Sequence, residues 1–283
     1  MPKRLLALAI SIATSGIGLT TVLGPIIAGA LRAVFGSSPT RKRRSSAASR
    51  MGGSAPRTPR GRLDDAQDIV GACHHAARLR HADPGPWTVL LGVLRDLRRN
   101  PREGFPVWDE IIRRDPWHRE GYLQMLGYLS PEECGSSTQQ NAFVDSAMAR
   151  MPFGAPPAAL EPHVLLGRYR RAVTGDGLTG LLADRIFNQP FAESVLSRAL
   201  STWPRPGFLR HAAALADLNV LAYLAAHARH RDAANAFRAV GATVTPWPWR
   251  LGGDPLEQYS TWRKYFPDPR MRRVRSLRAR RPG

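Results

Sequence analysis

Residues 108–129 read WDEIIRRDPWHREGYLQMLGYL, and this stretch determines the fold class that we expect. Four apolar residues in its second half recur at the spacing of one helix face: Tyr122, Met125, Leu126 and Leu129. Asp115-Pro116 interrupts the pattern, and a proline directly after a polar residue is well placed to begin a new helix. The stretch therefore predicts two consecutive helices joined by a short turn.

The same periodicity continues on both sides of this stretch. Further helical stripes are formed by Trp87, Leu90, Leu91, Leu94 and Leu97, by Leu218, Leu221, Ala222 and Ala225, and by Ala233, Ala236, Phe237 and Val240. Helix breakers separate them at 83–86, 100–101, 130–131, 135–136, 154–157, 175–177 and 204–207. Only residues 242–247, ATVTPW, read as a short extended segment. We therefore predict an all-α body over residues 64–269, made of antiparallel helical hairpins.

The hairpin at 108–129 resembles a tetratricopeptide-type hairpin, in which an Asp-Pro turn separates two helices. Residues 87–265 more broadly resemble uncharacterised helical-repeat proteins of actinobacteria, through RDPWHRE, the Gly135-Ser136 turn, PFGAPP and AFRAVGATVTPWPW. The stretch SPEECGSSTQQN departs from the Trp and His expected around that turn. The resemblance implies a tetratricopeptide-like stack, and it carries over no catalytic residue.

Charge divides the chain into four parts. Residues 1–63 contain eleven Lys and Arg and no acid, and residues 270–283 contain seven Arg and no acid. The part between them contains 23 basic residues and all 22 acids of the chain, so the body carries almost no net charge. We expect a hydrophobic segment at 1–35, a flexible basic linker at 36–63, the helical body at 64–269 and a basic tail at 270–283.

The segment 1–35 has the composition of a membrane-spanning helix. The 27 residues between Arg4 and Arg32 carry no charge, and a bilayer requires about 20 apolar residues. More basic residues follow this run than precede it, so the positive-inside rule places the body in the cytoplasm. We predict a single-pass membrane protein with a cytoplasmic body. A signal peptide cleaved after Ala28-Gly29-Ala30 and an organelle presequence are the alternatives.

Two features near this segment suggest contacts. The basic cluster of Arg41, Lys42, Arg43 and Arg44 is predicted to lie against an anionic lipid surface or simply to set the topology of the span. Small residues recur every fourth position at Gly16, Thr20, Gly24 and Ala28, a stripe that allows two membrane helices to approach closely. A homodimer through this stripe is a secondary hypothesis.

No recognised catalytic motif is present in the sequence. The nucleophile-elbow, phosphate-loop and dinucleotide-binding patterns are all missing. Cys73 and Cys134 are too few for a disulfide framework, and the histidines His74, His75, His81, His227 and His230 lack the spacing of a metal site. We predict no catalytic, cofactor or metal residue, and we lean toward a protein that is not an enzyme.

Aromatic residues are densest near the end of the body. Trp247, Trp249, Arg250 and Trp262 form a candidate partner-binding group, because tryptophan and arginine are enriched at binding hot spots. The alternative, which we favour, is that the aromatic rings cap the end of the helical stack.

The sequence thus predicts a membrane-anchored, non-enzymatic helical-repeat module that binds a protein of unknown identity. The alternative is a soluble or exported helical protein that binds nucleic acid through its two basic tails. An enzyme with a site built from Cys73 and the histidines is a third class.

Overall fold

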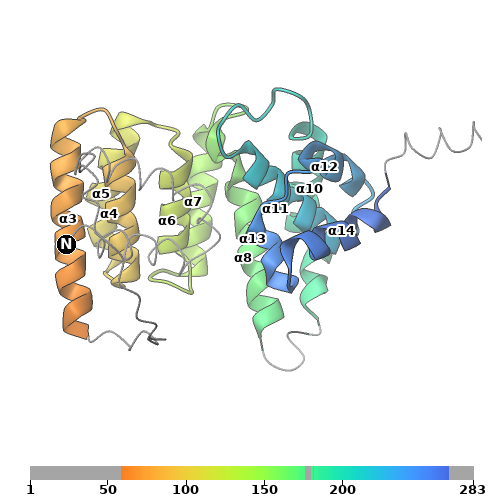
Figure 1. Ribbon diagram of the computed structural model, residues 1–283, viewed down its shortest axis with the longest axis horizontal. Helices are drawn as coiled ribbons and strands as arrows, with labels where there is room; N and C mark the ends of the chain where they lie inside the picture. Colours follow the sequence, from red (N-terminus) through yellow and green to blue (C-terminus); the bar gives the residue numbers. More distant parts are fainter. Residues whose placement is uncertain (1–58, 176–179, 181, 268–283) are drawn as a thin grey trace, which may run out of the picture. The chain divides into compact units, whose positions relative to one another are not determined.

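The computed structural model describes residues 59–175, 180 and 182–267, shown in Figure 1. These residues form α-helices and short 3-10 helices, and no strand occurs among them, so the all-α prediction is confirmed for the described chain. None of the described helices is long and apolar enough to cross a membrane. The predicted anchor at 1–35, with its small-residue stripe, and the cluster of Arg41, Lys42, Arg43 and Arg44 lie outside the described residues.

The described chain divides into two compact units with the boundary between Gln139 and Gln140, whereas the sequence predicted one body over 64–269. Unit 1 contains α3 (Pro59–Leu79), α4 (Gly85–Asp96), α5 (Pro101–Arg114) and α6 (Arg119–Tyr128). Helix α3 thus begins within the segment that was predicted to be linker. Helix α4 packs against α3, α5 and α6 and is the centre of the unit, with Leu91 completely buried.

The predicted breakers end and begin the helices of unit 1. The side chain of Asn100 accepts a hydrogen bond of 3.0 Å from the backbone N–H of Arg102, and Pro101 occupies the first helical position of α5. This is the favourable combination of a polar N-cap and a proline that needs no hydrogen-bond partner. After Arg114, the carboxylate of Asp115 accepts from the backbone N–H of Trp117 and closes the turn that leads to α6.

Helices α5 and α6 approach closely because a glycine stands at the contact. A Cβ added to Gly104 would lie 2.3 Å from the ring of Tyr128 and 3.2 Å from Leu91. The Tyr128 hydroxyl donates to the backbone carbonyls of Arg99 and Asn100, so the ring is held in place. Every residue of α6 is buried, whereas the sequence predicted one apolar face.

Unit 2 contains helices of varied length around α11. They are α7 (Ser137–Arg150), η1 (Pro156–Ala159), α8 (Leu160–Thr174), η2 (Ala183–Asn188), α10 (Pro190–Thr202), α11 (Ala214–His227), α12 (Ala233–Val240), α13 (Pro246–Trp249), η3 (Arg250–Gly252) and α14 (Pro255–Tyr265). The boundary between the units lies in the first turn of α7.

Helix α11 is the core of unit 2. It packs against α8, α10, α12 and α13, and all its residues from Asp217 to Ala226 are buried. Ala222, Ala225 and Ala226 are completely buried, and their small side chains allow neighbouring helices to approach. The segment 242–247 is no strand: Thr245 has an extended backbone and precedes the short helix α13.

Candidate functional site

The aromatic residues predicted to bind a partner are mostly interior. Trp249 is completely buried and Trp247 is 8 % exposed, while Trp262 is half-buried. Arg250 is exposed, and its guanidinium lies over the Trp247 ring, 5.8 Å from its centroid. The buried rings suit the capping interpretation, and partner binding through these four residues stays a prediction.

A buried asparagine holds this aromatic segment against α11. The Asn219 amide donates to the backbone carbonyls of Leu215 and Thr243 at 2.8 and 3.1 Å. Its oxygen accepts from the backbone N–H of Thr245 and from the indole N–H of Trp249, the latter at 2.9 Å. Asn219 is completely buried, so all four bonds lie within the core of unit 2. This arrangement orders the segment 243–249, and it leaves no polar group of Asn219 available to a ligand.

His227 lies in a second interior cluster, at the end of α11. Its Nδ1 is 2.9 Å from the hydroxyl of Tyr169, which also lies 3.4 Å from a carboxylate oxygen of Asp184. The rings of Tyr223 and Trp262 contact the imidazole, with centroid distances of 4.3 and 4.7 Å. Burial lowers the pKa of His227 to about 4 and raises that of Tyr169. The imidazole is therefore neutral at physiological pH, held by rings on several sides.

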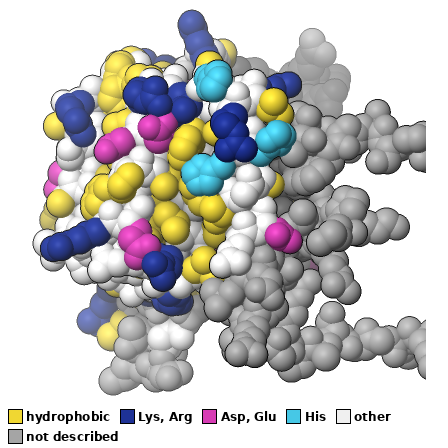
Figure 2. Space-filling model, turned by 90° about the vertical axis from the view of Figure 1, so that its left-hand side faces the viewer, with side chains coloured by type: hydrophobic (Ala, Val, Ile, Leu, Met, Phe, Trp, Pro, Cys, Tyr) yellow, Lys and Arg dark blue, Asp and Glu magenta, His cyan; other side chains and the backbone are white. Residues whose placement is uncertain are grey.

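The histidines near Cys73 lie on the face of unit 1 that carries α3. Figure 2 shows histidine side chains on this face among hydrophobic and arginine side chains. His74, His75 and His81 are exposed, whereas Cys73 is buried and its desolvation raises the thiol pKa to about 12. Within the described chain, no three His, Cys, Asp or Glu side chains are grouped so that they could hold a metal ion.

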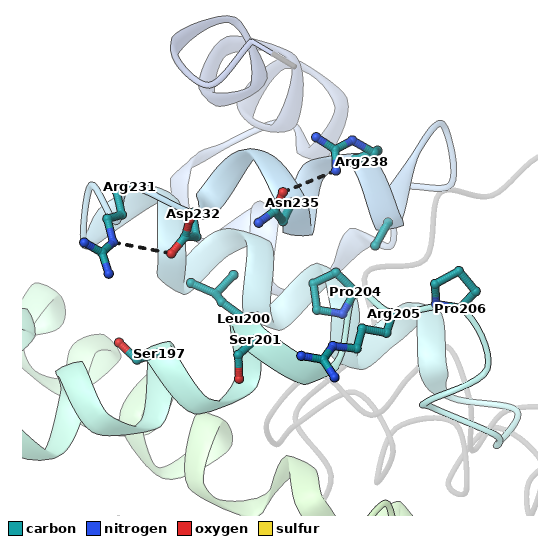
Figure 3. Close-up of a pocket in the computed structure, with 11 residues that line it drawn as sticks. Ser197, Leu200, Ser201, Pro204, Arg205, Pro206, Arg231, Asp232, Asn235 and Arg238 are labelled. Carbon is teal, nitrogen blue, oxygen red and sulfur yellow. Dashed lines mark hydrogen bonds and ion pairs between the residues drawn. The ribbon is translucent and has the colours of Figure 1, made fainter. Parts of the chain in front are cut away.

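A surface hollow in unit 2 lies between α10 and α12 and has a volume of about 770 Å³ (Figure 3). Its walls are α10 with the turn that follows it on one side, and α12 with the residues that precede it on the other. The polar residues that line it are Ser197, Ser201, Arg205, Arg231, Asp232, Asn235 and Arg238. No sequence pattern predicted this group, because the proximity of its members depends on how α10 and α12 pack against α11 and against each other.

At one end of the hollow, the side chains of a serine, a histidine and an aspartate follow one another in space. The Ser197 hydroxyl is 3.4 Å from Nε2 of His230, and Nδ1 of His230 is 3.9 Å from a carboxylate oxygen of Asp232. These are the residue types of a hydrolytic triad, in which histidine removes the proton of the serine. The hydrogen bonds around His230 determine whether that chemistry is available.

The backbone N–H of Asp232 donates to Nδ1 of His230 at 3.1 Å. A neutral imidazole that accepts at Nδ1 carries its proton on Nε2, so it faces Ser197 as a donor. The Ser197 hydroxyl in turn donates to the Glu193 carboxylate at 3.0 Å. The proton arrangement is thus the reverse of that in a catalytic triad, and the 3.9 Å separation of His230 and Asp232 exceeds hydrogen-bond length. We interpret Ser197 and Asp232 as part of the polar wall of the hollow, and His230 as a buried neighbour of both.

Comparison of the chain with protein families, with curated proteins and with solved structures found no match.

Proposed function

We propose that this protein is a membrane-anchored, non-enzymatic helical module of tetratricopeptide-like architecture, and that a protein partner binds in the hollow of unit 2. The observation that carries the proposal is the hollow itself, with a volume of about 770 Å³ and a lining of arginine, hydroxyl and amide groups. Its volume lies in the range of ligand-binding clefts, and its polar groups face outward rather than into the core.

The exposed apolar surface of unit 2 supports a protein as the partner. Phe153 is 86 % exposed, the largest exposed fraction among the large hydrophobic residues described, and its ring contacts that of Phe208. Exposed aromatic residues next to arginine are the residue types that dominate binding energy at protein interfaces. The nonproductive proton arrangement at Ser197 and His230 favours binding over hydrolysis.

A photo-crosslinking residue placed at Ser201 would test the binding site. Ser201 lines the hollow, and Ser260, an exposed serine on α14 outside the hollow, is the matched control position. We expect a distinct cross-linked protein from position 201 that is missing from position 260. The same cross-linked products from both positions would contradict a partner site in the hollow.

The membrane anchor rests on the uncharged run of residues 5–31 and on the basic residues that follow it. Carbonate extraction of membranes separates an integral protein from a peripheral one. We expect the full chain to stay in the membrane pellet and a chain without residues 1–35 to become soluble. Release of the intact full chain by carbonate would overturn the anchor.

Nucleic-acid binding through the tails is the second candidate, favoured by eighteen basic residues in 1–63 and 270–283 with no acid among them. Such binding would fall steeply with salt, because it depends on release of counterions. DNA retention at moderate salt that disappears on deletion of 36–63 and 270–283 would support this candidate. Unchanged retention after the deletion would exclude the tails as the site.

A further inference from the structure

Charge is unevenly distributed along the hollow of unit 2. At one end, Nε of Arg231 lies 3.5 Å from the Asp232 carboxylate. The Ser197 hydroxyl donates a hydrogen bond to the neighbouring carboxylate of Glu193, so two acids lie at or beside this end. Figure 3 shows Arg205 and Arg238 toward the other end, one on the turn after α10 and one on α12. The second end is therefore the electropositive part of the hollow.

These two arginines come from opposite walls, an arrangement that suits a bound anion. Arg238 donates to the side-chain oxygen of Asn235 at 3.2 Å, and both residues line the hollow. Among the residues that the structure describes, no carboxylate forms an ion pair with Arg205. A guanidinium presents a planar set of donors that matches a carboxylate, so the two walls offer charge-assisted hydrogen bonds to an acidic side chain.

The turn at the same end of the hollow also carries Phe208, whose half-buried ring contacts that of the exposed Phe153. The backbone N–H of Phe208 donates to the carbonyl of Arg205 at 3.2 Å, and Gly207 has a φ of +76°, so one tight turn carries both residues. The rings of Phe208 and Phe153 lie edge to face, with centroids 5.1 Å apart. A ligand held by Arg205 thus has an apolar surface within reach.

We propose that the hollow recognises an acidic protein segment, with carboxylates on Arg205 and Arg238 and an adjacent apolar side chain on Phe153 and Phe208. This inference rests on the proposed function and names the chemistry of the partner. A protein segment fits better than a nucleic acid, because Asp232 and Glu193 would repel a phosphate backbone that continues along the hollow.

The test uses the full chain in detergent micelles and a fluorescein-labelled peptide in which aspartates flank a phenylalanine, measured by fluorescence anisotropy at physiological ionic strength. Because the basic tails attract any acidic peptide, the variant Arg205→Glu/Arg238→Glu, which keeps both tails, isolates the hollow. Arg185→Glu/Arg102→Glu is the matched control, since it changes the net charge by the same amount and both residues are exposed and do not line the hollow. We expect the double variant to weaken binding about tenfold and the control to stay within about twofold of the unaltered chain.

Two further probes test the chemistry of the ligand. A peptide with asparagine in place of aspartate and one with serine in place of phenylalanine should each bind more weakly than the parent peptide. Equal weakening by the double variant and by its control Arg185→Glu/Arg102→Glu would mean that only overall charge matters, and it would overturn the proposal. Stronger binding of a single-stranded DNA oligonucleotide that the double variant abolishes would also overturn it, in favour of nucleic acid.

Failure of this inference is distinguishable from failure of the proposed function. If the peptide does not bind but position 201 still cross-links a distinct protein, the hollow is a partner site with a different ligand chemistry. If position 201 yields no distinct product either, both the partner site and its chemistry are wrong.

Discussion

The hydroxyl of Tyr169 on α8 lies 2.9 Å from Nδ1 of His227 at the end of α11, and it lies 3.4 Å from the Asp184 carboxylate on η2. A chain in which His227 donates to the hydroxyl, and the hydroxyl donates to Asp184, satisfies all three groups. Three elements of unit 2 are thus joined through a side-chain network in which the imidazole is neutral.

This network predicts a loss of stability in mild acid. Burial lowers the pKa of His227 from its usual 6.5 to about 4, so the unfolded chain binds a proton that the folded chain does not accept. The part of the free energy of unfolding that depends on a neutral His227 is fully present above pH 6.5 and is lost as the pH falls toward 4. It amounts to about 3 kcal/mol for a shift of this size.

The measurement is urea unfolding of the full chain and of His227→Gln at pH 7.5 and pH 4.5. The variant removes the titrating group. Between pH 7.5 and pH 4.5 it should therefore lose about 3 kcal/mol less of its free energy of unfolding than the unaltered chain does. The same pH dependence in both proteins would show that His227 does not titrate in this range.

The second prediction concerns Ser197, which has the neighbours but not the proton arrangement of a nucleophile. Because Nδ1 of His230 accepts from the backbone N–H of Asp232, the imidazole is a poor base toward the Ser197 hydroxyl. A fluorophosphonate reagent should not label the protein. The intact mass should therefore be the same before and after treatment, both for the unaltered chain and for Ser197→Ala. Stoichiometric labelling that Ser197→Ala prevents would establish a hydrolytic site.

The third prediction follows from the four hydrogen bonds of Asn219. Asn219→Ala leaves the indole N–H of Trp249 and backbone groups of Thr243 and Thr245 unpaired in the core. We expect the free energy of unfolding to fall by about 2–4 kcal/mol, measured by urea denaturation. Asn188→Ala, at an exposed position, is the control and should change it by less than about 0.5 kcal/mol. Similar losses in both variants would contradict the role assigned to Asn219.

The fourth prediction compares two glycines in helices. Gly104→Ala places a methyl group 2.3 Å from the held ring of Tyr128 and should destabilise the protein by about 1–3 kcal/mol. Gly71→Ala on α3 meets nothing within 4 Å and should stabilise it by about 0.5–1 kcal/mol. Thermal unfolding of both variants is the measurement, and stabilisation by Gly104→Ala would mean that α5 and α6 are farther apart than described.

The fifth prediction separates binding from stability at Phe153. Phe153→Ser removes an aromatic ring that is 86 % exposed, so the free energy of unfolding should change by less than about 0.5 kcal/mol. The yield of the cross-link from position 201 should fall, because the ring lies beside the hollow. Leu256→Ser, which removes an exposed apolar side chain from α14, should preserve that yield. An unchanged yield for Phe153→Ser would remove this residue from the partner site.

Local signals in the sequence were reliable where neighbouring residues determine the structure. Asn100-Pro101 begins α5 as predicted, and Leu91 and Met125 from the predicted stripes are completely buried. The stripes predicted one buried face, yet α6 and much of α11 are buried on all sides. Helices α4 and α5 pack against α6, and helices α8, α10, α12 and α13 pack against α11. In the first turn of α6, Arg119 and Glu120 form a buried ion pair, although residues of both types are usually exposed.

The hollow lay beyond what the sequence could predict. Arg205 follows α10 and Arg238 is on α12, and only the packing of both helices against α11 brings them to one surface. Neither residue has a distinctive neighbour in the sequence, and arginine is common throughout this chain. Phe153 is exposed because of the path of the loop between α7 and η1. Apolar periodicity predicts the buried faces of helices and says nothing about exposure in a loop.

Helix α12 has two sides that belong to different parts of unit 2. Asn235 and Arg238 face the hollow, whereas Phe237 lies among the rings of Trp249, Tyr259 and Phe266. The Tyr259 hydroxyl donates to the Phe237 carbonyl, so the aromatic segment is attached to the backbone of α12 itself. A ligand that shifts α12 should therefore change the surroundings of the Trp249 indole, which is one of seven tryptophans in the chain, and the part of the emission change that Trp249→Phe removes would report occupancy.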